Sequence, residues 1–113
     1  MKKILILLSA LLVMAACGKK EVDLTTTFEK SNYQETDDYE GTIAYAKGLA
    51  QQFDQVHYQS IGKTVLGREV PLLIVDENGY TSPKKIRKSG KNIILVQSCI
   101  HPGEPNGKDA MFL

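Results

Sequence analysis

Cysteine and histidine are scarce in this chain, and neither sign of charge dominates it. Two cysteines and two histidines occur among 113 residues, and 14 Lys and Arg side chains nearly balance 13 Asp and Glu. No basic stripe interleaved with aromatic side chains is present, so the sequence predicts no nucleic-acid partner. The small number of cysteines also excludes a fold held together by a framework of disulfides.

The apolar run at the N-terminus is too short to cross a membrane. It covers residues 4–14, whereas a helix needs ~20 residues to span the hydrocarbon core of a bilayer. Lys2 and Lys3 precede it and Ala15-Ala16-Cys17 follow it, which is the order of charged, apolar and small residues in a secretory signal. The sequence therefore predicts that residues 1–16 are a signal peptide.

Cys17, directly after two alanines, resembles the lipobox cysteine of bacterial lipoproteins. The resemblance implies that Cys17 is acylated and anchors the mature chain to a bacterial membrane, on the extracytoplasmic side of the cell envelope. Several acyl chains on one residue give stable anchoring, because each buried CH₂ contributes about 0.8 kcal/mol. The alternative is an ordinary signal peptide with a cysteine near its cleavage site. The polar residues 17–35 are predicted to be a flexible tether.

Two further features are predicted to be structural. Cys99 follows an apolar run between Ser98 and Ile100, so we expect it to be a small buried hydrophobe without a disulfide partner. The only basic cluster, at 84–88, lies between Ser82-Pro83 and Ser89-Gly90. It is predicted to be a solvated surface loop.

A helix and a hairpin are predicted in the first part of residues 36–113. Apolar side chains spaced three and four residues apart indicate a helix stripe, with Thr36, Asp37 or Asp38 available as the N-cap. Strands are predicted over 56–61 and 70–75, with residues 62–69 as the connection of a hairpin. The helix stripe consists of Tyr39, Ile43, Ala46, Ala50 and Phe53.

A third strand and a second helix are predicted closer to the C-terminus. Residues 93–96 are apolar without alternation, which is typical of a strand covered on both faces. A helix is predicted to start near Asn106. Together these elements predict an α/β domain with a mixed sheet. Residues 110–113 are apolar and helical in pattern with no cap, so we expect the domain to be truncated here.

His101-Pro102-Gly103-Glu104-Pro105, directly after the predicted third strand, contains two residues of the types that bind zinc. The two prolines fix φ and remove two N–H groups, which predicts a stiff loop rather than a helical turn. Such a loop can hold His101 and Glu104 toward one point and loses little conformational entropy when a metal binds. The other histidine, His57, has no ligand-like neighbour in the sequence. The alternative is a polar turn in which Glu104 accepts backbone N–H bonds and His101 caps the strand end.

Residues 39–113 resemble the zinc carboxypeptidases, the carboxypeptidase A-like metallopeptidases, in several segments that follow one another in the family's order. These are the helix at 39–53, a Gly-x-(Ser/Thr)-x-x-Gly-Arg-x-(Ile/Val) hairpin within 61–72, a strand at 92–97, a His-x-x-Glu zinc motif at 101–105 and the start of a helix at 106–110.

The resemblance implies a mixed-sheet α/β domain of the zinc-carboxypeptidase-like (phosphorylase/hydrolase-like) type, truncated after its first metal-binding loop. Residues 36–113 would be the N-terminal part of this catalytic domain. His101 and Glu104 would be the first two ligands of Zn²⁺. The family's second zinc-binding His, its general-base Glu and the arginines that hold the substrate's carboxylate would lie downstream of residue 113. Arg68 occupies the hairpin position, where we expect a structural role.

The predicted function is that of a membrane-tethered, extracytoplasmic zinc metallocarboxypeptidase that hydrolyses peptide bonds. This chain would be an inactive N-terminal fragment of it. The partners would be a peptide substrate and the lipid bilayer, through acylated Cys17. Two alternatives remain open. One is a related zinc-dependent hydrolase of peptidoglycan peptides or an amino-acid deacylase, and the other is a ligand-binding lipoprotein without catalytic activity.

Overall fold

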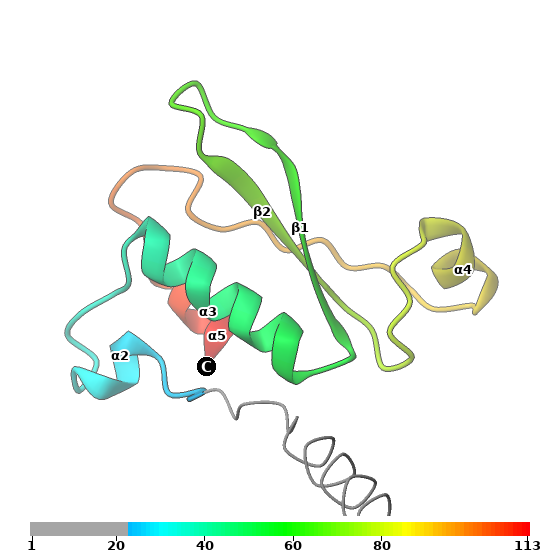
Figure 1. Ribbon diagram of the computed structural model, residues 1–113, viewed down its shortest axis with the longest axis horizontal. Coiled ribbons are helices and arrows are strands. Elements are labelled where there is room, and N and C mark those ends of the chain that lie inside the picture. Colours follow the sequence, from blue (N-terminus) through cyan, green and yellow to red (C-terminus); the bar gives the residue numbers. More distant parts are fainter. Residues whose placement is uncertain (1–22) are drawn as a thin grey trace, which may run out of the picture.

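The structure is a computed structural model that describes residues 23–113 (Figure 1). The predicted signal peptide, Cys17 and the start of the predicted tether lie outside these residues. The elements in chain order are α2 (Thr27–Lys30), α3 (Tyr39–Gln52), β1 (Val56–Lys63), β2 (Glu69–Val75), α4 (Pro83–Lys88) and α5 (Asn106–Phe112). Among the described residues, no helix has both the length and the apolar character needed to cross a membrane.

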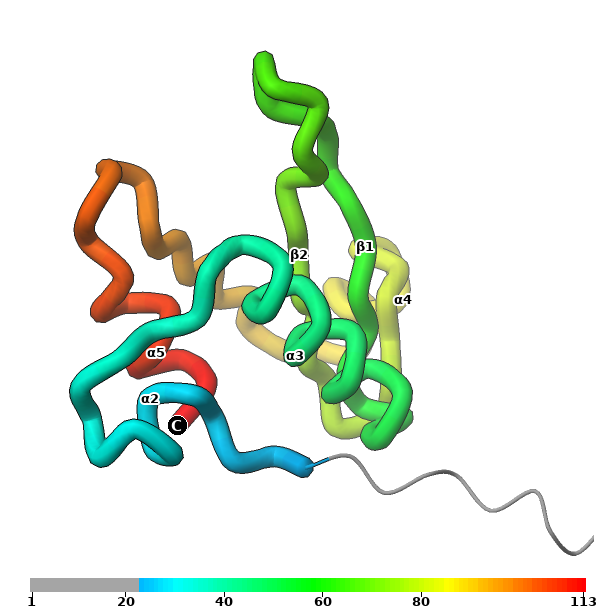
Figure 2. Tube along the Cα trace, turned by 60° about the vertical axis from the view of Figure 1, so that its left-hand side comes forward, coloured from blue at the N-terminus to red at the C-terminus, as the bar shows by residue number. Residues whose placement is uncertain are grey.

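Helix α3 forms where the sequence predicts it. The Asp38 carboxylate is the N-cap and accepts a hydrogen bond of 2.8 Å from the backbone N–H of Gly41, which satisfies one free donor of the first turn. Ile43 and Ala46 of the predicted apolar stripe are buried on the side of α3 that contacts β1, whereas Phe53, its last member, is the C-cap and is exposed. Figures 1 and 2 both show α3 lying across the hairpin on one side. This contact forms the core of the described chain.

Strands β1 and β2 form the predicted antiparallel hairpin, in register from Val56 opposite Val75 to Ser60 opposite Pro71. The pairing is irregular between Ser60 and Lys63, so β1 runs two residues beyond the predicted end. Gly67 closes the connection at φ +77°, a left-handed conformation that glycine adopts without a steric cost. The hairpin prediction is confirmed.

The prediction of a strand at 93–96 is wrong for the part of the chain that the structure describes. Residues 91–100 are a coil, and the apolar side chains of 93–96 are 59% to 84% exposed. A central strand exists only where neighbouring strands pair with its backbone groups, and the described residues supply one sheet of two strands. The predicted mixed sheet is therefore not present among them. The described residues form helices and a two-stranded antiparallel sheet instead.

The basic cluster at 84–88 is a short helix, α4, rather than the predicted loop. Pro83 begins it, because its fixed φ suits the first helical position and its missing N–H costs no hydrogen bond there. The Ile86 N–H donates to the Ser82 carbonyl over 3.0 Å. The expected exposure of the cluster to solvent is nonetheless correct for Lys84, Lys85, Arg87 and Lys88.

Part of the segment that was predicted to be a flexible tether forms a short helix, α2. Thr26 is buried and caps α2 by a reciprocal pair of bonds with Glu29, in which each residue's backbone N–H donates to the other's side chain. The Thr26 backbone N–H holds the pKa of the Glu29 carboxyl below its usual value. The Tyr45 hydroxyl of α3 donates to the Leu24 carbonyl over 2.9 Å. The segment before α3 is thus attached to the domain.

Candidate metal centre

The loop that carries His101 and Glu104 turns sharply at Gly103, whose φ is +80°. Pro102 and Pro105 flank this turn and fix φ on either side of it. The Pro105 carbonyl then accepts the backbone N–H groups of Lys108 and Asp109, at 2.9 and 3.2 Å, and so begins α5. The sequence correctly predicted both a non-helical loop and a helix from Asn106.

The loop brings the two predicted ligands together. The Nδ1 atom of His101 lies 3.1 Å from the Oε2 atom of Glu104. Both side chains are about two-thirds exposed, at 68% and 67%. In the alternative interpretation as a polar turn, Glu104 would accept backbone N–H bonds, but its partner in the described chain is the imidazole.

The distance between these two atoms suits a shared zinc ion. Tetrahedral Zn²⁺ with bonds of about 2.0–2.2 Å to nitrogen and oxygen places neighbouring ligand atoms about 3.3–3.5 Å apart. The observed separation of 3.1 Å differs from that edge by a few tenths of an ångström. In the structure the two atoms contact each other directly, so a zinc ion between them would replace this contact.

The described residues do not supply a third ligand. Within 23–113, no group of three or more His, Cys, Asp and Glu side chains is arranged to hold a metal ion. His57 lies exposed on β1, opposite Ile74 of β2, and forms no such group with His101 and Glu104. The two predicted ligands are thus fewer than the three protein ligands that a catalytic zinc site usually has.

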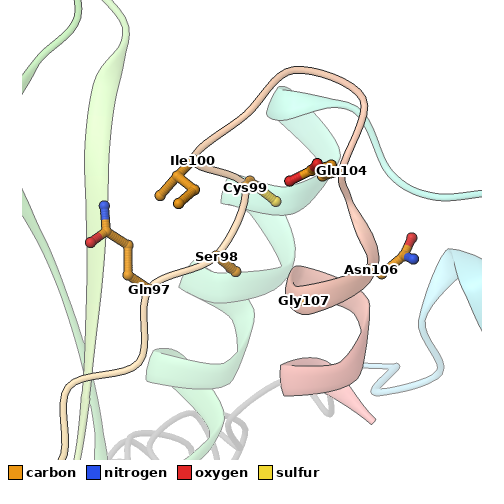
Figure 3. A pocket seen from close by; sticks show the side chains of 7 residues that line it. All are labelled: Gln97, Ser98, Cys99, Ile100, Glu104, Asn106 and Gly107. Atoms are coloured by element: carbon orange, nitrogen blue, oxygen red, sulfur yellow. The ribbon is translucent and has the colours of Figure 1, made fainter.

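Cys99 is exposed, so the prediction that it is buried is wrong. The chain does not form the strand that was to bury it, and Cys99 itself has φ +56°, where the backbone turns away from an extended path. Its side chain lines a hollow of about 440 Å³ together with Ser98 and Glu104 (Figure 3). Asn106 and Gly107 at the start of α5 form the opposite wall in the same view.

A partly buried polar network around Lys108 was not predicted from the sequence. The Lys108 ammonium contacts the Thr36 hydroxyl oxygen at 2.6 Å, the Asp109 carboxylate at 2.8 Å and the Asp37 carbonyl at 3.3 Å. The Thr36 hydroxyl also bonds to Asp109, at 3.0 Å. The only available signal was that Lys108 and Asp109 lie in the first helical turn after the ligand loop. Adjacent opposite charges usually lie on the surface, so this signal is weak.

Arg68 contacts the hairpin and α3 rather than the metal loop. Its guanidinium carbon lies 5.2 Å from the centre of the Tyr39 ring, within the range of a cation–π contact. The Tyr39 hydroxyl donates to the Glu69 carbonyl over 3.0 Å. These contacts join the start of α3 to the start of β2, which is a structural role.

Comparison with known protein families gives a match over most of the described chain. The model of a protein family described as zinc carboxypeptidase matches residues 42–113. No curated protein and no solved structure matches the chain. The matched region takes in most of α3, the hairpin, the His101–Glu104 loop and α5.

Proposed function

This chain belongs to the zinc carboxypeptidase family, and we propose that His101 and Glu104 are two of the zinc ligands of a metallocarboxypeptidase that hydrolyses peptide bonds. At the level of the family, the protein is a carboxypeptidase-like hydrolase. The observation that carries the ligand assignment is the 3.1 Å separation of His101 Nδ1 and Glu104 Oε2.

The chemistry of the two side chains fits the metal. Imidazole nitrogen and carboxylate oxygen are ligand types that Zn²⁺ accepts in catalytic sites. Zinc in such a site polarises the scissile carbonyl and lowers the pKa of the attacking water. The contribution of this loop is to hold two ligand atoms toward one point and to leave them open to solvent, as their exposure allows.

The rest of the site is proposed to come from outside these 113 residues. A second His and a general-base Glu complete the site in the family that the chain resembles, and the described residues hold no third ligand. We therefore expect this chain alone to have little or no peptidase activity. In the complete domain, the exposed apolar residues 93–96 would form an inner strand of a mixed sheet.

Tethering to a membrane is a separate part of the proposal and rests on the sequence alone. Cys17 would be acylated and would hold the domain on the extracytoplasmic side of the cell envelope. The mass of the N-terminal peptide isolated from membranes measures this directly. A diacylglycerol mass that is absent from a Cys17→Ala variant supports the anchor, and an unmodified cysteine contradicts it.

Zinc content of the protein extended by its downstream coding sequence tests the enzymatic proposal. We expect one equivalent of zinc, lost in His101→Ala and retained in His57→Ala, which removes an exposed histidine outside the loop. The same preparations would be assayed on peptides with free C-termini, on peptidoglycan peptides and on N-acyl amino acids. Absence of zinc would contradict the proposal and favour a ligand-binding lipoprotein. Zinc with activity only on the latter two substrates would correct the substrate class.

A further inference from the structure

The network around Lys108 joins parts of the chain that are far apart in sequence. Lys108 and Thr36 are separated by 72 positions, yet their side chains form the shortest polar contact of the cluster, at 2.6 Å. Thr36 and Asp37 lie just before α3, and the Asp37 carboxylate accepts a bond of 2.7 Å from Thr27 at the start of α2. Figures 1 and 2 both place α5 beside the chain that leads from α2 into α3.

The two charged members of the network are buried, whereas Thr36 lies at its exposed edge. The side chains of Lys108 and Asp109 are only 9% and 11% exposed. A buried charge is costly unless it is paired and hydrogen-bonded, and the loss of one partner leaves the others uncompensated. The beginning of α5 is therefore held in one position relative to Thr36.

The position of α5 determines the two ends of the metal loop. Pro105, one residue after Glu104, is bonded through its carbonyl to the N–H groups of Lys108 and Asp109. At the other end, Ser98 approaches Gly107 so closely that a Cβ atom on Gly107 would lie 2.9 Å from the Ser98 Cβ. The segment that carries His101 and Glu104 thus runs directly into the first turn of α5 at one end and packs against that turn at the other.

We propose that Thr36, Lys108 and Asp109 are positioning residues for the metal site. Their network holds α5 in place and thereby presets the loop in the geometry that brings His101 Nδ1 and Glu104 Oε2 together. The inference rests on the proposed zinc site. None of the three residues touches the metal in this arrangement, so each acts through the loop. The segment before α3, which contributes Thr36, thereby helps to determine the geometry of the metal site.

A Zn²⁺ titration of the full chain tests the proposal. Zinc binding is monitored through the ring-proton NMR signals of His101, and those of His57 serve as the internal reference. Thr36→Val keeps the shape of the side chain and removes the hydroxyl, whereas Thr36→Ser keeps the hydroxyl. We expect Thr36→Val to weaken zinc binding at His101 about tenfold, in the range found when the partners of metal ligands are removed. Thr36→Ser should restore most of the affinity. Asp76→Asn, which breaks an ion pair away from α5, should leave zinc affinity unchanged even where it lowers the melting temperature.

Three outcomes contradict the inference. Zinc affinity in Thr36→Val equal to that of the wild type contradicts positioning and leaves the zinc site intact. Equal weakening by Asp76→Asn shows that the effect is a general loss of stability. A wild-type chain in which His101 responds to zinc no more than His57 contradicts this inference, because a preset pair of ligands should bind zinc more tightly than a single exposed histidine; the proposed ligands themselves are contradicted only if the extended protein holds no zinc.

A measurement on the unaltered chain covers the case in which Thr36→Val does not fold. If the network favours the loop geometry that zinc binds, zinc must stabilise the network in return. The amide hydrogens of Lys108 and Asp109 should then exchange several-fold more slowly with zinc than without it, while the Asn78 amide should not change. Unchanged exchange at Lys108 and Asp109 contradicts the inference.

Discussion

The backbone conformation of Gly103 determines whether the side chains of His101 and Glu104 can approach each other. Its φ of +80° places the chain in the left-handed region, where a side chain costs about 1–2 kcal/mol. No other atom lies within 4 Å of the position that a Cβ would take, so the cost of a substitution is conformational and not a clash. The separation of His101 and Glu104 therefore depends on a backbone angle that glycine adopts freely.

Replacing Gly103 by alanine should weaken zinc binding by shifting the loop away from this angle. We expect a several-fold loss of zinc affinity at His101 and a loss of about 1 kcal/mol in the free energy of unfolding. Titration with Zn²⁺ and chemical denaturation measure the two effects. Gly90→Ala is a matched control, because Gly90 also has a positive φ, of +75°, and open space around it. A drop in zinc affinity in Gly90→Ala as large as that in Gly103→Ala would show that the loop geometry is not responsible.

At the scale of single residues, the sequence predicted the placement of side chains that depends on residues nearby in the chain. His101 and Glu104 were predicted to meet because prolines and a glycine within five residues determine the loop. Cys99 was placed incorrectly, because its burial depended on strands that would have to come from elsewhere in the chain. The network of Thr36 and Lys108 was missed for the same reason, since its members are far apart in sequence.

Lys91 forms ion pairs with two carboxylates of the turn after β2. Lys91 lies 2.9 Å from Asp76 and 3.1 Å from Glu77, and it also bonds to the Asn78 side chain. The Lys91 ammonium, together with backbone N–H groups of the turn, holds the pKa of the Asp76 carboxyl below its usual value of 3.8. In return, Asp76 raises the pKa of Lys91 above its usual value of 10.5.

These shifts determine how the stability of the pair depends on pH. A lowered carboxyl pKa contributes stability that is present above pH 3.8 and is lost as the pH falls through the folded-state value. A raised ammonium pKa contributes stability that is present below pH 10.5 and is lost as the pH rises through its folded-state value. The pair therefore stabilises the chain throughout the neutral range.

Asp76→Asn should destabilise the chain at pH 7 and progressively less below pH 3.8, because the wild type loses the same charge there. Urea denaturation at a series of pH values measures the difference in the free energy of unfolding. Glu77→Gln is the control, because Glu77 is 77% exposed and screened by water. A difference between Asp76→Asn and wild type that stays constant down to pH 2 would contradict the ionic origin of the effect.

The elements that the sequence predicted correctly are those stabilised within a short stretch of chain. Helix α3 has its own cap and an inward stripe, and the hairpin is formed by two adjacent strands. The strand at 93–96 had the right composition but needs backbone partners that the described residues do not supply. Helix α4 was missed because four basic residues suggested a loop, while Ser82 and Pro83 favoured a helix start.

Across the whole molecule, the described chain has a small core and a large exposed apolar surface. Ile43 and Ala46 are its buried apolar residues, whereas Ile94 and Leu95 are 84% and 78% exposed. Exposed apolar runs with unpaired backbone groups favour self-association. The fold class that the sequence indicated was more detailed than the described residues show: they form helices and a two-stranded antiparallel sheet, and the predicted mixed sheet would need strands from elsewhere in the domain.

Replacing Ile94 and Leu95 together by serine should reduce self-association of this chain without loss of stability. Exposed side chains contribute little packing, so we expect the free energy of unfolding to change by no more than about 0.5 kcal/mol. Ile43→Ala, at a buried position, should cost about 2–5 kcal/mol in comparison. Sedimentation velocity and chemical denaturation measure the two properties. A double variant as unstable as Ile43→Ala would show that residues 93–96 are packed in solution.

The bond between Thr36 and Lys108 also has a consequence in time. Ribosomes add about 5–20 residues per second, so roughly 4 to 14 seconds separate the synthesis of these two partners, which are 72 positions apart. During that interval the Thr36 hydroxyl remains hydrated, because its partner Lys108 has not yet been synthesised. The contact that would fix the position of the loop is therefore absent. The metal loop therefore acquires its shape only after Lys108 has been added to the chain, when α3 and the hairpin have had time to form.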